Sequence, residues 1–312
     1  MVKLQAQIIG LKVPVLLAKE IYTPEKFNIS AKISDYCQFV KFRLTSLVVF
    51  SAVICFAFGS SSIDWTKLVL LVLGGFLVTG SSNGFNQILE KDTDKLMART
   101  QNRPLPQERM GISEAFVVAS LMGITGIFIL WYYMNPLSGI LGLLALILYT
   151  VVYTPLKKIT PFAVFVGAFP GAIPPLLGYV AATNTIDVQG LILFAIQFIW
   201  QFPHFWAIAW VIDEDYRKAG FQMLPSAGGR DKSSGFQILT YSLGLIPISL
   251  LPLMFKMTGN ISAAVILICA SIFAWIAYKL YKNCSTEVAS KLMFASFIYL
   301  PIVQVLLLID KL

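Results

Sequence analysis

Residues 68–106 read LVLLVLGGFLVTGSSNGFNQILEKDTDKLMARTQNRPLP. The first part of this stretch, 68–89, carries no charge and is long enough to span a membrane, since a spanning helix needs about 20 mostly apolar residues. Asn86, Glu90 and Asp94 recur every four residues, so they form one polar row if the helix continues. The stretch predicts a spanning helix that ends in a row of amide and carboxylate oxygens.

Basic residues crowd the chain around and after this row: Lys91, Lys95, Arg99, Arg103 and Arg109. Oxygen ligands suit Mg²⁺, which commonly binds one or two carboxylates together with substrate phosphates. Arginine binds phosphate through two parallel hydrogen bonds, which lysine cannot do. The combination indicates a site for a metal ion and a polyanion, whereas the simpler interpretation is a solvated helix end beside ordinary basic anchors.

The rest of the chain indicates a multi-pass membrane protein of the all-α class. Hydrophobic residues make up 57% of the sequence, charged residues only 13%, and the mean hydropathy is +0.75, well outside the range of soluble domains. Apolar segments predict nine spans, at 44–63, 68–89, 112–133, 137–154, 161–181, 188–211, 235–255, 258–279 and 291–309.

The net charge of +8 is compatible with a nucleic-acid partner or a membrane surface, and its distribution favours the membrane. With the N-terminus inside, every Lys and Arg except Lys67, Lys256 and Lys311 falls on the inner side of a nine-span chain. This asymmetry follows the positive-inside rule. We therefore expect a cytoplasmic N-terminus, a lipid bilayer as surroundings and no nucleic-acid partner.

Residues 1–35 contain charges of mixed sign and no apolar core of a signal peptide. We expect them to form a cytoplasmic, amphipathic or flexible tail, and 36–312 to form the polytopic domain. The four cysteines are scattered without a CxxC pair, so neither a disulfide framework nor a thiolate metal site is expected.

Two long loops on the inner side, 90–111 and 212–234, hold most of the polar residues. When Leu105-Pro106 is superposed on Leu224-Pro225, Asp94 falls on Asp213. The loops follow spans that are four apart, which suggests a duplicated four-helix unit. Chance similarity explains so few identities equally well.

Asp213 and Asp215 offer a second carboxylate group in the second loop, beside Tyr216, Arg217 and Lys218. Two carboxylate sites around one diphosphate are a way to share two Mg²⁺ ions. The alternative is that these acids only balance the charge of the neighbouring Arg217 and Lys218.

Three further segments attract attention. Tyr153-Thr-Pro-Leu-Lys157-Lys158 follows the fourth span. Gly167, Gly171 and Gly178 in the fifth span indicate close helix packing, and Pro174-Pro175 predicts a kink or break that frees backbone groups. The segment Trp200-Gln-Phe-Pro-His204-Phe-Trp206 holds the only histidine, whose aromatic neighbours suit a flat ring, although a lone histidine is commonly a hydrogen-bonded core residue.

These residues resemble the UbiA-type intramembrane prenyltransferases, and within them the protohaem IX farnesyltransferase branch. The first signature is Asn86-Gln-x-x-Glu90-x-Asp-x-Asp94-x-x-Met-x-Arg99-Thr-x-x-Arg103-Pro-Leu. The second is Pro203-His-Phe-Trp206 followed by Asp215-Tyr-Arg-x-Ala-Gly-x-x-Met-Leu-Pro225. Two departures are Lys41-Phe42-Arg43, where the branch has Lys-Pro-Arg, and Val211, where the superfamily has Asp.

The resemblance implies nine transmembrane helices around a central cavity, Mg²⁺ as cofactor, and farnesyl diphosphate and protohaem IX as substrates. It implies catalytic roles for Asn86, Glu90, Asp94 and Asp215, metal binding by these four and Asp213, diphosphate binding by Arg99, Arg103, Lys157, Lys158, Arg217 and Lys218, and porphyrin contacts by Tyr153, Trp200, His204, Trp206 and Tyr216.

The implied reaction adds a farnesyl group and a hydroxyl to a vinyl group of the haem, giving haem O, at the cytoplasmic side of a bacterial inner membrane. Complexes with haem A synthase or with oxidase assembly proteins would suit such a product. Three alternatives stay open: a prenyltransferase for a quinone precursor or chlorophyllide, a transporter for a porphyrin or anionic lipid, and a haem-binding assembly partner without catalysis.

Overall fold

The computed structural model describes residues 28–312, all helical apart from connecting loops and one isolated bridge between Thr258 and Lys311. Residues 35–312 form one compact unit, and the described residues before Asp35 belong to another. Helix α2 (Ile29–Phe39) begins within the expected tail. The expectation for residues 1–27 lies outside the described residues.

The prediction of nine spans is confirmed for the described part of the chain, in which nine helices are long and apolar enough to cross a membrane. Each observed helix overlaps the predicted segment, and the ends differ by a few residues. The helices are α3 (Phe42–Gly59), α4 (Trp65–Leu89), α6 with η2 (Ile112–Met134), α7 with η3 and α8 (Pro136–Leu156), α9 (Ala163–Thr183), α10 (Val188–Val211), α12 (Lys232–Met254), α13 (Asn260–Asn283) and α14 (Thr286–Ile309).

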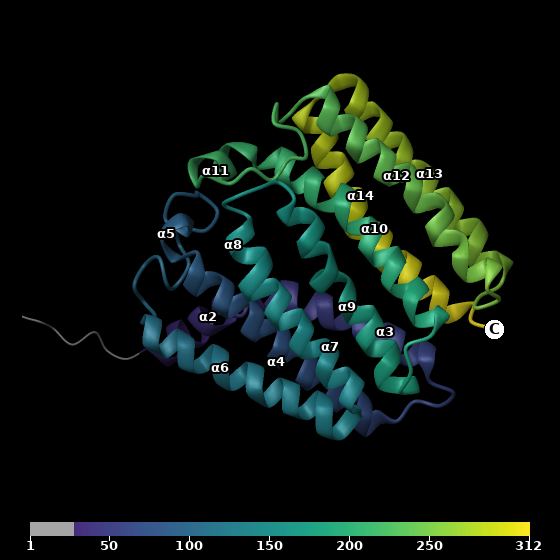
Figure 1. Cartoon of the computed structure of the whole chain (residues 1–312), viewed down its shortest axis with the longest axis horizontal. Coiled ribbons are helices and arrows are strands. Elements are labelled where there is room, and N and C mark those ends of the chain that lie inside the picture. Colours follow the sequence, from purple (N-terminus) through teal and green to yellow (C-terminus); the bar gives the residue numbers. More distant parts are fainter. Residues whose placement is uncertain (1–27) are drawn as a thin grey trace, which may run out of the picture. The chain divides into compact units, whose positions relative to one another are not determined.

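Helix α9 lies between two groups of helices (Figure 1). It packs against α3 and α7 on one side and against α10 on the other, while α4 pairs with α6 and α12 pairs with α13. Helix α14 closes the bundle because it contacts both α10 and α3. The first and last spans therefore meet.

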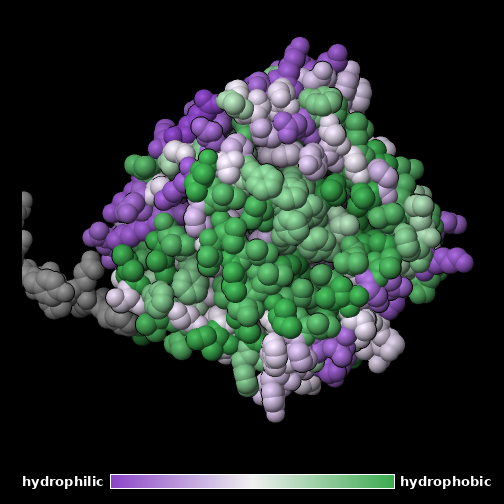
Figure 2. All heavy atoms as spheres, in the orientation of Figure 1, coloured by the Kyte–Doolittle hydropathy of each residue, from purple (hydrophilic) through white to green (hydrophobic). Residues whose placement is uncertain are grey.

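Polar and apolar side chains separate on the surface (Figure 2). Hydrophilic residues gather at the end of the unit that carries α5 (Lys91–Asp94) and α11 (Asp213–Lys218), and again at the opposite end, with a hydrophobic band between them. Such a band is the surface that a bilayer solvates. Figure 1 also shows that α5, α8 (Thr154–Leu156) and α11 lie at the same end of the bundle.

The proline pair in α9 does not break the helix, which runs without interruption from Ala163 to Thr183. Proline has no N–H to donate to the carbonyl four residues earlier, so Pro175 leaves the oxygen of Gly171 without its helical partner. Gln197 of α10 donates its Nε2 to this oxygen at 2.7 Å. The predicted free carbonyl exists, and a side chain of the neighbouring helix satisfies it.

The packing interpretation of the glycines is confirmed at Gly178. A Cβ built there would collide with the backbone oxygen of Ala52 in α3. Without a side chain at this position, α3 and α9 approach closely, as small residues allow in membrane helices.

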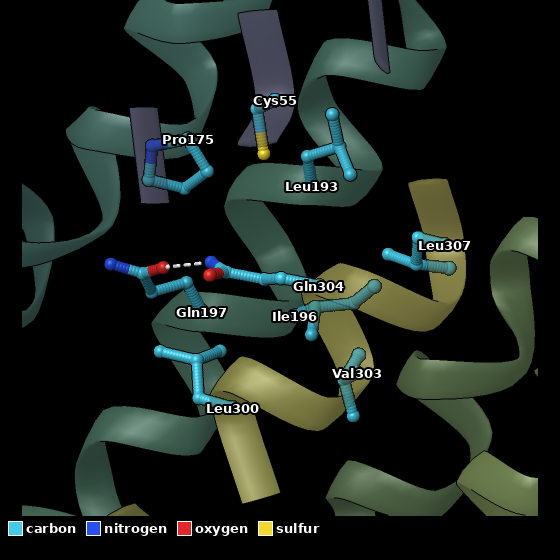
Figure 3. A pocket seen from close by; sticks show the side chains of 9 residues that line it. All are labelled: Cys55, Pro175, Leu193, Ile196, Gln197, Leu300, Val303, Gln304 and Leu307. Carbon is cyan, nitrogen blue, oxygen red and sulfur yellow. Dashed lines mark hydrogen bonds between the residues drawn. The ribbon is translucent and has the colours of Figure 1, made fainter. Parts of the chain in front are cut away.

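Two cavities lie inside the bundle. One, of about 10 Å³, is lined by residues of α3, α9, α10 and α14, with Cys55, Pro175, Gln197 and Gln304 among them (Figure 3). The other, of about 40 Å³, lies among α3, α4, α7 and α9. A water molecule needs about 10–15 Å³ by this kind of measure, so side chains must move before a large substrate can enter either space.

Candidate active site

The polar row at the end of α4 forms as the sequence predicts. Helix α4 ends at Leu89, but the backbone bonds continue from Glu90 N to Asn86 O (3.0 Å) and from Asp94 N to Glu90 O (2.7 Å). Asn86 donates its Nδ2 to Glu90 Oε2 at 2.8 Å. All three side chains are buried, with exposed fractions of 2% for Asn86, 4% for Glu90 and 0% for Asp94.

Two basic side chains neutralise this row. Lys157, which follows α8, places its Nζ 2.5 Å from Glu90 Oε1, and Arg103 places its Nη1 2.7 Å from Asp94 Oδ2. Burial lowers the pKa of Lys157, but the attraction and hydrogen bond of Glu90 outweigh it, so that this pKa is raised. Lys157 is therefore held in its charged form beside Glu90.

A third cation, Lys41, was not among the predicted site residues. Its Nζ donates to Asn86 Oδ1 at 2.9 Å, and its backbone has φ 49°, a left-handed conformation at the junction between α2 and α3. Burial lowers the pKa of Lys41 to about 7, and repulsion by Arg103 and Lys157 acts in the same direction. The signal in the sequence was the segment Lys41-Phe42-Arg43 before the first span.

A distortion of the fourth span brings further polar atoms to the row. Residues Leu148–Tyr153 form a π-helical turn, a feature frequently found at functional sites. The turn is followed by Thr154, whose hydroxyl donates to Tyr149 O at 2.8 Å and accepts from Asn86 Nδ2 at 3.3 Å. Thr154 is a second contact that the sequence did not single out.

The two long loops meet at this place. Lys157 Nζ lies 5.0 Å from the ring centre of Tyr153 and 5.5 Å from that of Phe221, and Phe221 contacts the ring of Tyr216 with a centroid distance of 6.0 Å. Met97 of the first loop belongs to the same buried cluster as Phe221. Through Lys157, which also pairs with Glu90, the second loop lies beside the first.

The acids of the second loop, in contrast, pair within their own loop. Asp213 Oδ2 lies 2.9 Å from Arg217 Nε and 3.8 Å from Arg230 Nε, and Asp215 Oδ1 lies 3.5 Å from Lys218 Nζ. Among residues 28–312, no group of three or more His, Cys, Asp or Glu side chains lies close enough to hold a metal ion. In this structure nearer cations of their own loop hold Asp213 and Asp215, and the expectation that they join Glu90 and Asp94 around a metal stays a prediction.

Other predicted diphosphate residues lie at the surface. Arg99, Lys158, Arg217 and Lys218 are exposed, and Arg99 acts electrostatically on Tyr153. Their cationic groups therefore lie at the rim of the site rather than inside the row.

The three α10 residues among those expected to contact a porphyrin divide between two faces of this helix. Trp200 and His204 face α14, where His204 Nδ1 lies 2.7 Å from Ser296 Oγ and Trp200 Nε1 donates to Ser296 O at 3.1 Å. Trp206 packs against Tyr241 of α12 with a centroid distance of 5.2 Å. Residues two apart on a helix do not share a face, so Trp206 does not join His204.

The oxygen atoms of the row fit a magnesium ion. Asp94 Oδ1 is buried without a hydrogen-bond partner among the described residues, and a buried carboxylate oxygen is costly unless a cation or donor meets it. Together with Glu90 and Asn86 it supplies the oxygen ligands that Mg²⁺ prefers.

Comparison with known proteins identifies the family. Residues 47–300 match the UbiA prenyltransferase family. The chain is 46% identical to protoheme IX farnesyltransferase of Cytophaga hutchinsonii over 283 residues, which cover 90% of this chain and 99% of the relative. It is 44% identical to the protein of the same name from Christiangramia forsetii, over 91% of this chain and 96% of that one.

Solved structures share the fold. Digeranylgeranylglyceryl phosphate synthase superposes with a TM-score of 0.75 at 21% identity, over 90% of this chain and 98% of that one. A UbiA homologue from Archaeoglobus fulgidus bound to DMAPP and Mg²⁺ gives a TM-score of 0.68 at 16% identity, over 88% of this chain and 99% of that one. With a profile match over most of its length and relatives this similar, the chain belongs to the UbiA prenyltransferase family.

Proposed function

We propose that the protein is a protohaem IX farnesyltransferase, which joins the farnesyl group of farnesyl diphosphate to a vinyl group of protohaem IX with addition of water, giving haem O and diphosphate. Relatives of that name match about nine-tenths of the chain at 44–46% identity. The observation that carries the proposal is the buried row of Asn86, Glu90 and Asp94 facing Lys157 and Arg103, since a prenyl diphosphate needs oxygen-bound metal and cations at one place.

Asn86, Glu90 and Asp94 are the residues that would hold Mg²⁺. The unpartnered Asp94 Oδ1 supports this assignment, as does the binding of Mg²⁺ with prenyl diphosphates in solved homologues. The ion supplies Lewis-acid neutralisation of the diphosphate oxygens. Asp213 and Asp215 would bind a second metal only after their ion pairs with Arg217 and Lys218 break.

Lys157 and Arg103 are the groups placed to receive the leaving diphosphate. When the C1–O bond of the substrate breaks, its electron pair stays on the diphosphate, and two cations already fixed at the site stabilise that charge without reorganising. Arg99, Lys158, Arg217 and Lys218 would attract the anion from the rim.

The farnesyl cation then reacts with the haem. The π electrons of the vinyl group form the new C–C bond, water adds to the carbon beside the porphyrin, and a proton is released. Tyr153 and Phe221 shield the site around Lys157 from water, which protects the cation until the vinyl group attacks. Trp200, His204 and Tyr216 would orient the porphyrin, whereas the position of Trp206 against α12 argues for a packing role.

The cytoplasmic face of a bacterial inner membrane is the proposed location of the site, since α5, α8 and α11 lie at one end (Figure 1) and the loops there carry the basic residues. Haem A synthase and oxidase assembly proteins are the partners that such a product suggests.

The test is incubation of the purified protein with haem, farnesyl diphosphate and Mg²⁺, followed by mass analysis of the haem. We expect a farnesyl-hydroxyethyl product, which is lost when a chelator is added and when Asp94 is changed to Asn. The control is Asp92→Asn, which changes an exposed carboxylate two residues away and should keep the activity. Prenylation of a quinone precursor instead of haem, or full activity of Asp94→Asn, would overturn the proposal.

A further inference from the structure

The hydrogen bonds of Ser296 determine which nitrogen of His204 carries the proton. Ser296 Oγ donates to the backbone oxygen of Met293 at 2.6 Å, and a hydroxyl has only one hydrogen to donate. The contact of 2.7 Å between Ser296 Oγ and His204 Nδ1 must then be donated by the histidine. A neutral imidazole with its proton on Nδ1 carries a lone pair on Nε2.

The imidazole ring is held firmly in this orientation. Trp200, one turn earlier on α10, stacks on it with a centroid distance of 4.2 Å and an interplanar angle of 18°. The same indole donates its Nε1 to the backbone oxygen of Ser296 at 3.1 Å. Phe297 meets the ring edge-on at 5.3 Å. Three contacts, with Ser296, Trp200 and Phe297, therefore fix the imidazole ring, and its Nε2 has no hydrogen-bond partner among the described residues.

His204 lies on the face of α10 that contacts α14, where its Nδ1 meets Ser296 Oγ. Gln197, two turns before His204, lies on the same face of the helix. It donates to Gly171 of α9 and accepts from Gln304 Nε2 of α14 at 3.0 Å (Figure 3). His204 itself is buried but not sealed, with 9% of its surface exposed.

The surroundings of His204 are apolar and aromatic. The ring of Phe205 lies 5.3 Å from the imidazole at an angle of 61°, and Phe297 is 46% exposed. Helix α10 carries no charged residue between Val188 and Val211. A flat apolar molecule can pack on these rings, and an iron atom at its centre could bind the lone pair of the His204 imidazole.

We propose that His204 binds the iron of the haem substrate through Nε2, with Ser296 as the positioning residue that keeps the proton on Nδ1. This inference rests on the proposed function, because it takes haem as the substrate. Metal-binding histidines almost always donate their other N–H to an oxygen atom, which fixes the tautomer and strengthens the ligand. Here the Ser296 hydroxyl serves as that oxygen.

Iron ligation would set how deep the haem lies. His204 precedes Val211, the last residue of α10, by seven residues, which is about 10.5 Å along the helix at ~1.5 Å per residue. Iron held at His204 places the centre of the porphyrin inside the membrane and leaves its edge to extend toward the diphosphate row. Ligation would therefore select haem over a metal-free porphyrin.

The decisive experiment uses the fact that the chain has a single histidine. Protein made with ¹⁵N-histidine, and purified through a tag without histidine, is mixed with ferrous haem and studied by resonance Raman spectroscopy. We expect an iron–histidine stretching band that shifts to lower frequency on ¹⁵N labelling. A bound haem whose spectrum contains no label-sensitive band would overturn the proposal without any mutation.

Variants provide a second, independent test, in which the affinities for haem and for metal-free protoporphyrin IX are measured by titration. We expect His204→Ala to abolish the preference for haem and added imidazole to restore it. Ser296→Ala should weaken haem binding by about tenfold, since loss of such a partner typically costs 10–100-fold in metal affinity, and should leave protoporphyrin binding unchanged. Ser242→Ala is the matched control, because Ser242 donates to Ile238 O at 2.8 Å in the same way but has no histidine beside it.

The outcomes separate this inference from the proposed function. If the wild-type protein makes haem O, but bound haem has the same Soret band in the wild type and in His204→Ala, ligation is refuted and the function is kept. Wild-type protein that binds haem through histidine but releases no diphosphate would refute the transferase and keep the ligation.

Discussion

Lys157 Nζ and Glu90 Oε1 are 2.5 Å apart in the interior of the bundle, and their side chains are only 10% and 5% exposed. The pair joins two spans that are distant in sequence. It also means that a cation of the chain itself covers the acidic row.

Removing one member of this pair should destabilise the protein more than removing both. Glu90→Gln leaves a buried lysine unpaired, which costs about 3–5 kcal/mol. Adding Lys157→Met to it should recover part of that loss, since coupled residues deviate from additivity by roughly 0.5–3 kcal/mol. Thermal unfolding in detergent, without Mg²⁺, measures both. Additive losses would show that the two side chains are not coupled.

The two arginines of the first loop should differ in their effect on substrate binding. Arg103 is fixed on Asp94, whereas Arg99 is exposed. A hydrogen bond to a charged group contributes about 1.5–3 kcal/mol, so we expect Arg103→Lys to raise the KM for farnesyl diphosphate by about tenfold or more. Arg99→Lys serves as the comparison and should change it less. Equal effects would contradict the assignment of Arg103 to the interior of the site.

Asp231 should stabilise the start of α12 in a pH-dependent manner. Its Oδ1 accepts from the backbone N–H of Ser234 at 2.8 Å, and its Oδ2 accepts from the hydroxyl of Ser226 at 2.7 Å. The hydrogen bond from the Ser234 backbone has the largest effect and holds the pKa of Asp231 below its usual 3.8. The hydroxyls of Ser226 and Ser234 act in the same direction, and partial burial opposes them.

Asp231→Ala should therefore lower the stability by about 1 kcal/mol at pH 7, the typical contribution of such a cap. A lowered folded-state pKa gives stability that is present above the unfolded value and is lost as the pH falls through the folded value. The difference between wild type and variant in thermal unfolding should thus shrink below about pH 4. A difference that grows on acidification would contradict the role of the carboxylate.

Gly178→Ala should separate α3 from α9. The added methyl group collides with the backbone of Ala52, which cannot rotate away, and overpacking typically costs 1–3 kcal/mol, here about 2. Gly244→Ala in α12 is the matched control, since a Cβ at that position meets no atom within 4 Å. Thermal stability in detergent should fall for the first variant and hold or rise for the second.

The sequence predicted the fold in detail where hydropathy alone decides it. All nine spans were found because each is a continuous apolar stretch, and only the bilayer imposes such lengths. The uninterrupted course of α9 was not predictable, because it depends on Gln197 of another helix meeting the oxygen that Pro175 leaves free.

The acidic row was predictable because its spacing of four residues is a property of one helix. The contributions of Lys41, Thr154 and Phe221 were not, since they come from other elements and depend on a left-handed residue, a π-helical turn and a loop contact. Pairing of Asp213 with Arg217 was visible as charge balance in the sequence, and the structure contains this local ion pair. The four-helix repeat stays a prediction.

The Lys157–Glu90 pair has a consequence for biosynthesis. Glu90 follows the second span and Lys157 follows the fourth, so the carboxylate is synthesised 67 positions before its counterion. Until the fourth span leaves the ribosome, the second has no lysine to cover its acidic end and must keep that end hydrated. We therefore expect the spans from α4 to α8 to partition from the translocon into lipid as one group, and a chain truncated after α6 to remain accessible to water at Glu90.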